Sequence, residues 1–343
     1  MTSFLRSDRS RAVALWLAAV AVLVVGMVVL GGSTRLTGSG LSITQWKPVS
    51  GALPPLNAAD WQVEFGRYQA IPQFRLVNPN MTLAAFKTIY WWEWAHRFLA
   101  RLLGAAYLLP LAVFAIRRQM PRRLVWQFVA ITALIGSEPV VGWWMVASGL
   151  AKLVHVAPER LAIHLGIAFA LLGALTWTAL DAWAGSARQT LPSPWGGRAL
   201  GLVGLIFVQI LLGALVAGNQ AGLVYNDWPL FAGHLLPQDY AAPGVWATLA
   251  HSQGAVQLHH RLAAYLLVVV AIGMAVAAVR SRYLAQASKH LALAAAGLVV
   301  VQALLGIATL MARVPIAMGV AHQLTAALTL SLAVAFAWRV RRI

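Results

Sequence analysis

The sequence predicts an all-α integral membrane protein with eight transmembrane helices, and three observations support this prediction. Of the 343 residues, 60% are hydrophobic and only 10% are charged, whereas a soluble domain carries about 25% charged residues. The apolar residues form eight long runs. Arginine and lysine are concentrated in every second connection between these runs.

Each apolar run has about 20 residues or more, which is enough for an α-helix to cross roughly 30 Å of hydrocarbon. The predicted spans are residues 12–31, 86–116, 124–146, 161–183, 199–218, 255–279, 289–312 and 317–338. The first run follows Arg6, Arg9 and Arg11 and has some features of a signal peptide. It is long for the apolar part of such a peptide and no clear small-residue cleavage site follows it, so it is predicted to be a span.

Basic residues predict the orientation of the chain. They occur at the N-terminus, between spans two and three (Arg117, Arg118, Arg122, Arg123), between four and five (Arg188, Arg198), between six and seven (Arg280, Arg282, Lys289), and at the C-terminus (Arg339, Arg341, Arg342). With eight spans, all of these positions fall on one side of the membrane. The positive-inside rule places that side, and therefore both termini, in the cytoplasm. The connections 32–85, 147–160, 219–254 and 313–316 then face outward, and the first is long enough to suggest a function.

The net charge of +17 would suggest a nucleic-acid partner in a soluble protein. Here the basic residues flank apolar spans, so they indicate orientation signals and contact with anionic lipid, with no nucleic acid involved. The absence of cysteine excludes disulfides, thiolate metal sites and cysteine nucleophiles. Asp181 lies near the inner end of the fourth span and is expected to be solvated.

The chain repeats internally. Matching residues are Gly40 with Gly222 and Trp46 with Trp228 at an offset of 182, His96 with His260 and Glu138 with Gln302 at 164, and His164 with His322 at 158. A unit with an even number of spans gives both copies the same orientation, which defines a parallel repeat. We therefore predict two tandem four-helix halves, residues 1–190 and 191–343, related by a pseudo-twofold axis along the membrane normal.

Four of the nine histidines follow this repeat: His96, His164, His260 and His322. Each lies in the outer third of a predicted span, so each half offers two imidazoles at a similar depth. Haem iron accepts two axial imidazoles, and a four-helix bundle can enclose the macrocycle. Zinc fits less well because a closed zinc site needs four ligands. A single histidine could simply bond a neighbouring helix, but four at repeated positions favour ligands.

The other histidines fit this pattern less well. Outer connections contain His155, His234 and His251, and His290 is at an inner helix end. His259 is adjacent to His260, and neighbouring helical residues point about 100° apart. The repeat aligns His260 with His96, so His260 is the predicted ligand and His259 a group beside it.

Glu93 marks a difference between the halves. It precedes His96 by three residues and shares its helix face, whereas the corresponding position in the second half is Gln257. A carboxylate inside a span is a functional candidate by default, so Glu93 is the predicted catalytic residue. The alternative is an i,i+4 ion pair with Arg97. For Glu138, the repeat partner Gln302 and the similar spacing of Gln209 and Gly213 favour a polar group at a close helix contact.

Arginines at the outer level are candidates for binding haem propionates, because arginine binds carboxylates well. They are Arg35, Arg97, Arg101 and Arg261, of which Arg97 and Arg261 follow the ligand histidines directly. A cluster of tryptophans at the same level fits either an interfacial belt or the wall of an apolar ligand pocket.

Several motifs together point to a known family. They are Gly31-Gly32-Ser33-Thr34-Arg35-Leu36-Thr37-Gly38-Ser39-Gly40-Leu41-Ser42, Glu93-Trp94-Ala95-His96-Arg97, Val256-Gln257-Leu258-His259-His260-Arg261, and His322. With these motifs the sequence resembles the haem A synthase family over nearly its whole length. The resemblance implies eight helices in two similar halves and oxidation of the C8 methyl group of haem O to the formyl group of haem A, for cytochrome oxidase.

The resemblance also implies roles for individual residues. His260 and His322 correspond to the family's haem b ligands, His96 and His164 to the pair associated with the substrate haem, and Glu93 to its glutamate. Some members carry a cysteine pair in the first outer loop, and this chain has no cysteine. A redox role for that pair therefore cannot operate here.

On residues alone, two other classes of function stay open. A dihaem b-type electron-transfer cytochrome would keep a permanent haem in both halves, and a secondary transporter would also suit a tandem repeat. The family reading adds a bacterial inner-membrane location. It also adds a haem O synthase and cytochrome oxidase assembly factors as candidate partners, and it leaves a homo-oligomer open.

Overall fold

The computed structural model describes residues 10–185 and 193–341. Within these ranges, eight helices are long and apolar enough to cross a membrane, which confirms the predicted spans. They are α1 (Arg11–Leu36), α4 (Leu83–Ile116), α5 (Val125–Ala151), α6 (Pro158–Ala184), α7 (Pro194–Gly218), α9 (Gln253–Arg280), α10 (Gln286–Met311) and α11 (Ile316–Val340). The described residues form no β-strand, so the all-α prediction is also confirmed.

Local sequence explains where several helices begin. The side chain of Thr82 accepts a hydrogen bond from the backbone N–H of Ala85 and caps α4, and Ser252 caps α9 in the same way. Such caps satisfy N–H groups that have no partner within the helix. Pro158 lies in the first turn of α6, where its missing N–H costs nothing.

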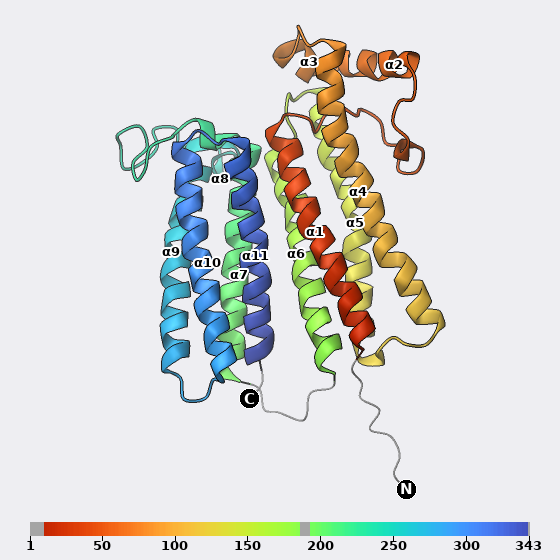
Figure 1. The fold of residues 1–343 in the computed structure, drawn as a ribbon. Helices are drawn as coiled ribbons and strands as arrows, with labels where there is room; N and C mark the ends of the chain where they lie inside the picture. Colours follow the sequence, from red (N-terminus) through yellow and green to blue (C-terminus); the bar gives the residue numbers. More distant parts are fainter. Residues whose placement is uncertain (1–9, 186–192, 342–343) are drawn as a thin grey trace.

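Short helices lie in the connections. The first outer connection contains η1 (Ser50–Ala52), α2 (Ala58–Gln69) and α3 (Pro72–Val77), and the third contains η3 (Ala221–Leu223) and α8 (Val245–His251), while η2 (Arg122–Leu124) precedes α5. Figure 1 shows α2, α3 and α8 at the same end of the molecule. A buried aromatic cluster that includes Trp61, Tyr68 and Phe86 fixes α2 and α3 against the outer end of α4.

The start of α1 and the end of α11 lie at the opposite end of the molecule (Figure 1). Ser10 donates its backbone N–H to the carbonyl of Ala182 at 3.0 Å. Arg341 pairs with Asp181 at 2.7 Å. The residue before the first transmembrane helix and the residue after the last one therefore contact the same end of α6. An even number of spans requires this arrangement.

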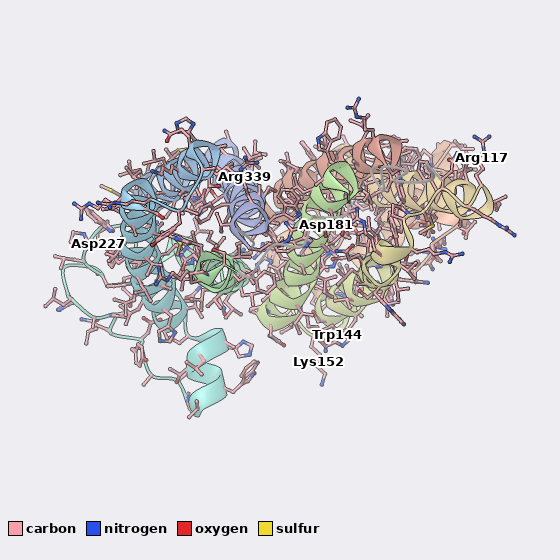
Figure 2. All side chains as sticks on the ribbon, turned by 90° about the horizontal axis from the view of Figure 1, so that it is seen from below. Arg117, Trp144, Lys152, Asp181, Asp227 and Arg339 are labelled. Atoms are coloured by element: carbon pink, nitrogen blue, oxygen red, sulfur yellow. The ribbon has the colours of Figure 1, made fainter. Side chains whose placement is uncertain are left out.

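The prediction that Asp181 is solvated was wrong. Its carboxylate is buried and accepts hydrogen bonds from Gln127 of α5, Trp338 of α11 and Arg341. The network joins three chain segments at the end of the molecule viewed in Figure 2, where Asp181 is labelled. A buried charge needs such partners to offset its lost hydration.

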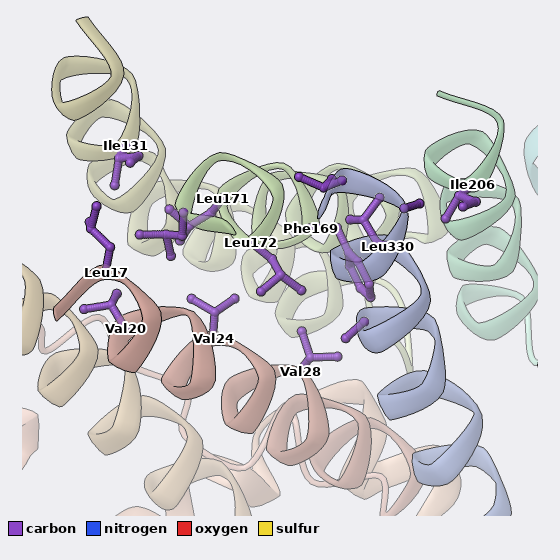
Figure 3. Packing of buried hydrophobic residues seen from close by; sticks show 14 of the residues in the cluster. Leu17, Val20, Val24, Val28, Ile131, Phe169, Leu171, Leu172, Ile206 and Leu330 are labelled. Carbon is purple, nitrogen blue, oxygen red and sulfur yellow. The ribbon is translucent and has the colours of Figure 1, made fainter. Parts of the chain in front are cut away.

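Helix packing defines two groups and one shared core. In the N-terminal half α1 packs against α4 and α6, and α5 packs against α6. In the C-terminal half α7, α9, α10 and α11 pack in a closed cycle. Contacts of α6 with α7 and of α1 and α6 with α11 join the halves, so one apolar cluster runs from Leu17 and Val24 to Ile206 and Leu330 (Figure 3).

Candidate haem-binding site

Each of the four predicted ligand histidines packs against a glycine on a neighbouring transmembrane helix. A Cβ atom built on the glycine would lie about 3 Å from the Cε1 atom of the ring in every case. The pairs are Gly31 with His96 (3.1 Å), Gly142 with His164 (3.1 Å), Gly213 with His260 (3.1 Å) and Gly306 with His322 (2.9 Å). A side chain larger than hydrogen would push the imidazole out of place, so the glycine sets the ring position.

The structure places these rings as one pair in each half. His96 of α4 faces α1 and His164 of α6 faces α5 in the N-terminal half, while His260 of α9 faces α7 and His322 of α11 faces α10 in the C-terminal half. All four histidine residues are half-buried. No group of three or more His, Asp or Glu side chains converges on a metal position within 10–185 and 193–341. Each half thus offers an imidazole pair, which suits haem better than zinc.

A polar side chain one turn before the glycine contacts three of the histidines. In the C-terminal half, Gln209 donates to the carbonyl of His260 at 3.0 Å and Gln302 donates to that of His322 at 2.9 Å. In the N-terminal half, Glu138 Oε2 lies 2.6 Å from His164 Nδ1. The spacing of a polar residue four positions before glycine was the signal for these contacts. It predicted a close helix contact but not a bond to a ligand histidine.

Glu93 is buried, and both oxygens of its carboxylate have hydrogen-bond partners. One carboxylate oxygen accepts hydrogen bonds from the Ser42 hydroxyl at 2.7 Å and the Ile43 N–H at 2.9 Å. The other accepts two from Arg97, at 3.1 and 2.6 Å. Glu93 therefore ties the first outer connection to α4 one turn from His96, and the i,i+4 ion pair weighed as the alternative is present.

The second half repeats this arrangement with an amide. Gln257 donates to the carbonyl of Ala221 at 2.7 Å and accepts from Arg261. Arg97 donates to the carbonyls of Ile43 and Gln45. Arg261 donates to those of Tyr225 and Asp227, which are the residues 182 positions later. The contacts of the loops thus recur at the offsets of the sequence repeat.

The four outer arginines bind backbone carbonyls. Arg35 donates to the carbonyls of Ala217 and Gly218 at the end of α7, and Arg101 to those of Lys47 and Pro48. Buried guanidinium nitrogens without a hydrogen-bond partner among the described residues remain on Arg35, Arg101 and Arg261. These nitrogens are the donors that a propionate could use. Arg97 has no such nitrogen, because Glu93 and the loop carbonyls engage it.

The other histidines have local surroundings. His259 Nε2 lies 3.2 Å from the Tyr240 hydroxyl in the third outer connection, so its ring points away from the His260–His322 pair. His155 lies in the second outer connection, where burial and the nearby Arg35 lower its pKa. His234 contacts Gln238, and His290 contacts Gln286.

The residues present fit haem. His96 Nδ1 and His322 Nδ1 are buried and lack a hydrogen-bond partner in the described chain, which is unfavourable unless another group engages the ring. The glycine beside each ring leaves no protein side chain at its Cε1 edge. An imidazole pair held this way between helices of a bundle can bind the two axial positions of one iron.

Comparisons with known proteins agree with this geometry. A family model, COX15-CtaA, described as cytochrome oxidase assembly protein, matches residues 14–334. The chain is 61% identical to the Heme A synthase of Caulobacter sp. (strain K31) over 342 residues, covering all of both chains. It is 59% identical to that of Caulobacter vibrioides over the same length. It is 47% identical to that of Parvibaculum lavamentivorans, covering 97% of this chain and 94% of the relative.

Full-length identity at this level, together with eight transmembrane helices and the histidine pairs, leaves no ambiguity of family. The motifs quoted above from the first outer connection, α4, α9 and α11 had indicated the same family. The chain belongs to the COX15-CtaA family of cytochrome oxidase assembly proteins, which contains the heme A synthases.

Proposed function

We propose that this chain converts haem O to haem A by oxidising the C8 methyl group of the porphyrin to a formyl group, as an oxidoreductase. The proposal places it in the bacterial inner membrane with both termini in the cytoplasm. The observation that carries it is the imidazole pair in each half, in a chain 61% identical over its full length to a Heme A synthase.

The two halves have different roles in this proposal. Residues 1–190 bind the substrate haem through His96 and His164, and residues 191–343 hold a haem b through His260 and His322. Haem b bound in the second half supplies an electron carrier. The contrast between Glu138 beside the His164 ring and Gln302 beside the His322 ring supports different roles, because a group that contacts the imidazole of a ligand histidine tunes the bound metal.

Glu93 is proposed to act in the first half in proton transfer or in orienting water. Conversion of the methyl to a formyl group exchanges two hydrogens for one oxygen atom and removes four electrons from the carbon, which an external oxidant must accept. Protons move near the substrate in this change, so a group that transfers them is needed. Both oxygens of Glu93 are engaged by Ser42, Ile43 and Arg97. The same contacts support a positioning role, in which Glu93 holds the first outer connection over His96.

Arginine donors at the outer level are proposed to receive the haem propionates. Of the two arginines that follow ligand histidines, Arg261 is a stronger candidate than Arg97, because the Nε of Arg261 is buried and has no hydrogen-bond partner in the described chain. Arg97 is proposed to act through the loop that it binds. A haem O synthase that supplies the substrate and assembly factors that receive the product complete the proposed partners, and haem O and haem A dissolve in the surrounding lipid.

The test is to extract haem from cells that make haem O but lack their own synthase, with and without this chain, and to separate haems B, O and A by chromatography. We expect new haem A together with a matching fall in haem O. If haem B co-purifies with the chain while haem O stays unchanged in an active donor background, the protein is a dihaem electron-transfer cytochrome instead. The absence of any haem absorbance after purification would favour a transporter.

A further inference from the structure

The two halves differ in how their second and third transmembrane helices meet. In the C-terminal half α9 packs against α10 and closes the bundle, whereas α4 and α5 do not pack along one another. The other three helix contacts of the bundle are present in both halves. One side of the N-terminal bundle, here called the α4–α5 seam, therefore lacks the helix contact that seals the other half.

Large side chains hold the seam apart. The hydroxyl of Tyr107 on α4 donates to the carbonyl of Phe128 on α5 at 3.1 Å and lies 3.1 Å from the Thr132 hydroxyl. The ring of Trp16 from α1 stacks on Tyr107 and on Phe128, with centroids 5.3 and 6.1 Å apart. Tyr107 is completely buried. It acts as a spacer, since its ring must fit between the two helix backbones.

The C-terminal half carries alanine at each corresponding position. Ala271 replaces Tyr107, Ala292 replaces Phe128, and Ala296 replaces Thr132, all at the offset of 164. These alanines are buried and lie on α9 and α10, the two helices that pack together in this half. Small residues allow transmembrane helices to approach closely, so the two halves are built for different separations at this contact.

Proline and glycine extend the difference. Pro110 lies inside α4 and Pro139 inside α5, and the residues 164 positions later are Met274 and Ala303. A proline in a helix interior removes a hydrogen bond and bends the helix. A Cβ atom built on Gly136 of α5 would meet nothing within 4 Å. The same holds for Gly104 of α4, while the repeat positions of these glycines hold valines, Val268 and Val300.

The seam lies at the level of the first histidine pair. Its inner limit is the Tyr107 contact, and its outer limit is Arg97, which lies over the ring of Trp143 on α5 at 5.9 Å. Nine residues of α4 lie between these limits, and the helix rises about 15 Å from Arg97 to Tyr107. His96 immediately precedes Arg97 and lies just beyond the outer limit of this stretch. His164 and Glu138 behind it have side chains 22% and 19% exposed, although both lie inside the bundle.

The ends of this bundle are covered. On the outer side, the carbonyls of the first connection bind Arg97, and Trp46 packs edge-on against Trp143 with ring centroids 5.4 Å apart. On the inner side, Trp16, Tyr107 and Phe128 fill the space between the helices. A flat, largely apolar ligand dissolved in the bilayer therefore meets the histidine pair most directly from the side.

We infer that the α4–α5 seam is the lateral passage through which the porphyrin substrate enters from the lipid and the product leaves. The inference rests on the proposed function, since it assigns the substrate to the N-terminal half. The C-terminal half, closed by α9 and α10, retains its haem.

The chain has no cysteine, so a pair of introduced cysteines can be cross-linked selectively. Ala100→Cys with Gly136→Cys places one thiol on each side of the seam, and Ala264→Cys with Val300→Cys is the matched pair 164 residues later. Each variant, reconstituted in lipid nanodiscs, is joined with a short cleavable bis-thiol reagent and supplied with haem O in vesicles. Haem A output and bound haem b are measured before and after cleavage by a reductant.

Cross-linking the α4–α5 pair is expected to lower haem A output by about tenfold or more, because passage becomes the slowest step. Cleavage should restore it, and bound haem b should not change. Cross-linking the α9–α10 pair should leave output unchanged. Full output from the cross-linked α4–α5 pair would overturn the passage, and absence of haem A from the unmodified chain would instead overturn the proposed function.

A second variant removes dependence on the cross-link. Gly104→Val with Gly136→Val gives the seam the residues of the other half, at positions where a Cβ meets open space. We expect kcat/KM for haem O to fall while bound haem b stays constant. An unchanged kcat/KM in a chain that keeps its haem b would contradict the inference.

Discussion

The N-terminal and C-terminal halves share one plan and differ in the places where chemistry requires it. Both hold an imidazole pair against glycines, and both fix an outer connection with an arginine four residues after an acid or amide. At two site positions the first half has a carboxylate where the second has an amide: Glu93 against Gln257, and Glu138 against Gln302. Its α4–α5 contact is also unsealed. In the proposed function, these few substitutions separate a half that retains haem b from a half that exchanges its substrate.

The largest expected effect separates the two histidine pairs. His322→Ala should remove the permanently bound haem b, because one imidazole cannot complete the axial pair. His164→Ala should leave haem b in place and abolish haem A formation. The measurement is the haem b absorbance of purified protein together with chromatography of extracted haems. Full haem b content in His322→Ala would show that the ligand is misassigned.

The second largest effect is expected from exchanging Glu93, the acid bonded to Arg97, for the amide found at Gln257. In Glu93→Gln the amide nitrogen would face Ser42 and Ile43, which are donors, so a buried donor loses its acceptor at a cost of about 1–3 kcal/mol. We expect haem A formation to fall by about a hundredfold if Glu93 also handles a proton.

The reciprocal change, Gln257→Glu, is the matched control: it sets a carboxylate oxygen against the carbonyl of Ala221, so it has a similar structural cost and no proton role, and turnover should fall much less than in Glu93→Gln. Haem A formation, bound haem b and proteolysis of the first outer connection are measured in parallel. A shifted pH profile of turnover would support a proton role, whereas faster proteolysis with an unchanged profile would support positioning alone. Full haem A production by stably expressed Glu93→Gln would remove both roles.

A smaller effect is expected at Glu138. Glu138→Gln gives His164 the amide neighbour that His322 has, and should weaken substrate haem binding by about tenfold, the lower end of such effects. Titration of haem O with the purified chain measures it, and Gln302→Glu is the counterpart in the other half. Equal affinity and an unchanged absorption spectrum in Glu138→Gln would show that the carboxylate does not tune the site.

The smallest effect concerns pH. The fourth outer connection, 313–316, has no histidine, whereas the second contains His155. Burial and the nearby Arg35 lower the pKa of His155 in the folded chain. The unfolded chain therefore binds this proton more readily than the folded chain. The stability that comes from the neutral ring is present above the ordinary histidine pKa of about 6.5 and is lost as pH falls below it. Thermal unfolding in detergent between pH 7 and pH 5 should show a steeper loss for the parent chain than for His155→Gln.

Most of the fold could be predicted from the sequence because apolar length and flanking charge act locally. The repeat also singled out the four histidines that the structure sets against a glycine of a neighbouring helix, since each copy checks the other. Asp181 was misjudged because its partners Trp338 and Arg341 come from a helix more than 150 residues away in sequence. The carbonyl partners of Arg97 were equally out of reach, because they depend on the path of a connection that has no periodic pattern.

The contact between the first and last transmembrane helices has a consequence for biosynthesis. Gly32 of α1 lies so close to Gln323 of α11 that a Cβ atom there would overlap the amide oxygen. Arg35, on the same helix, needs the carbonyls at the end of α7. During translation the first helix must therefore wait in the membrane until nearly the whole chain has been inserted. A chain released early would expose this face to lipid and to quality-control proteases.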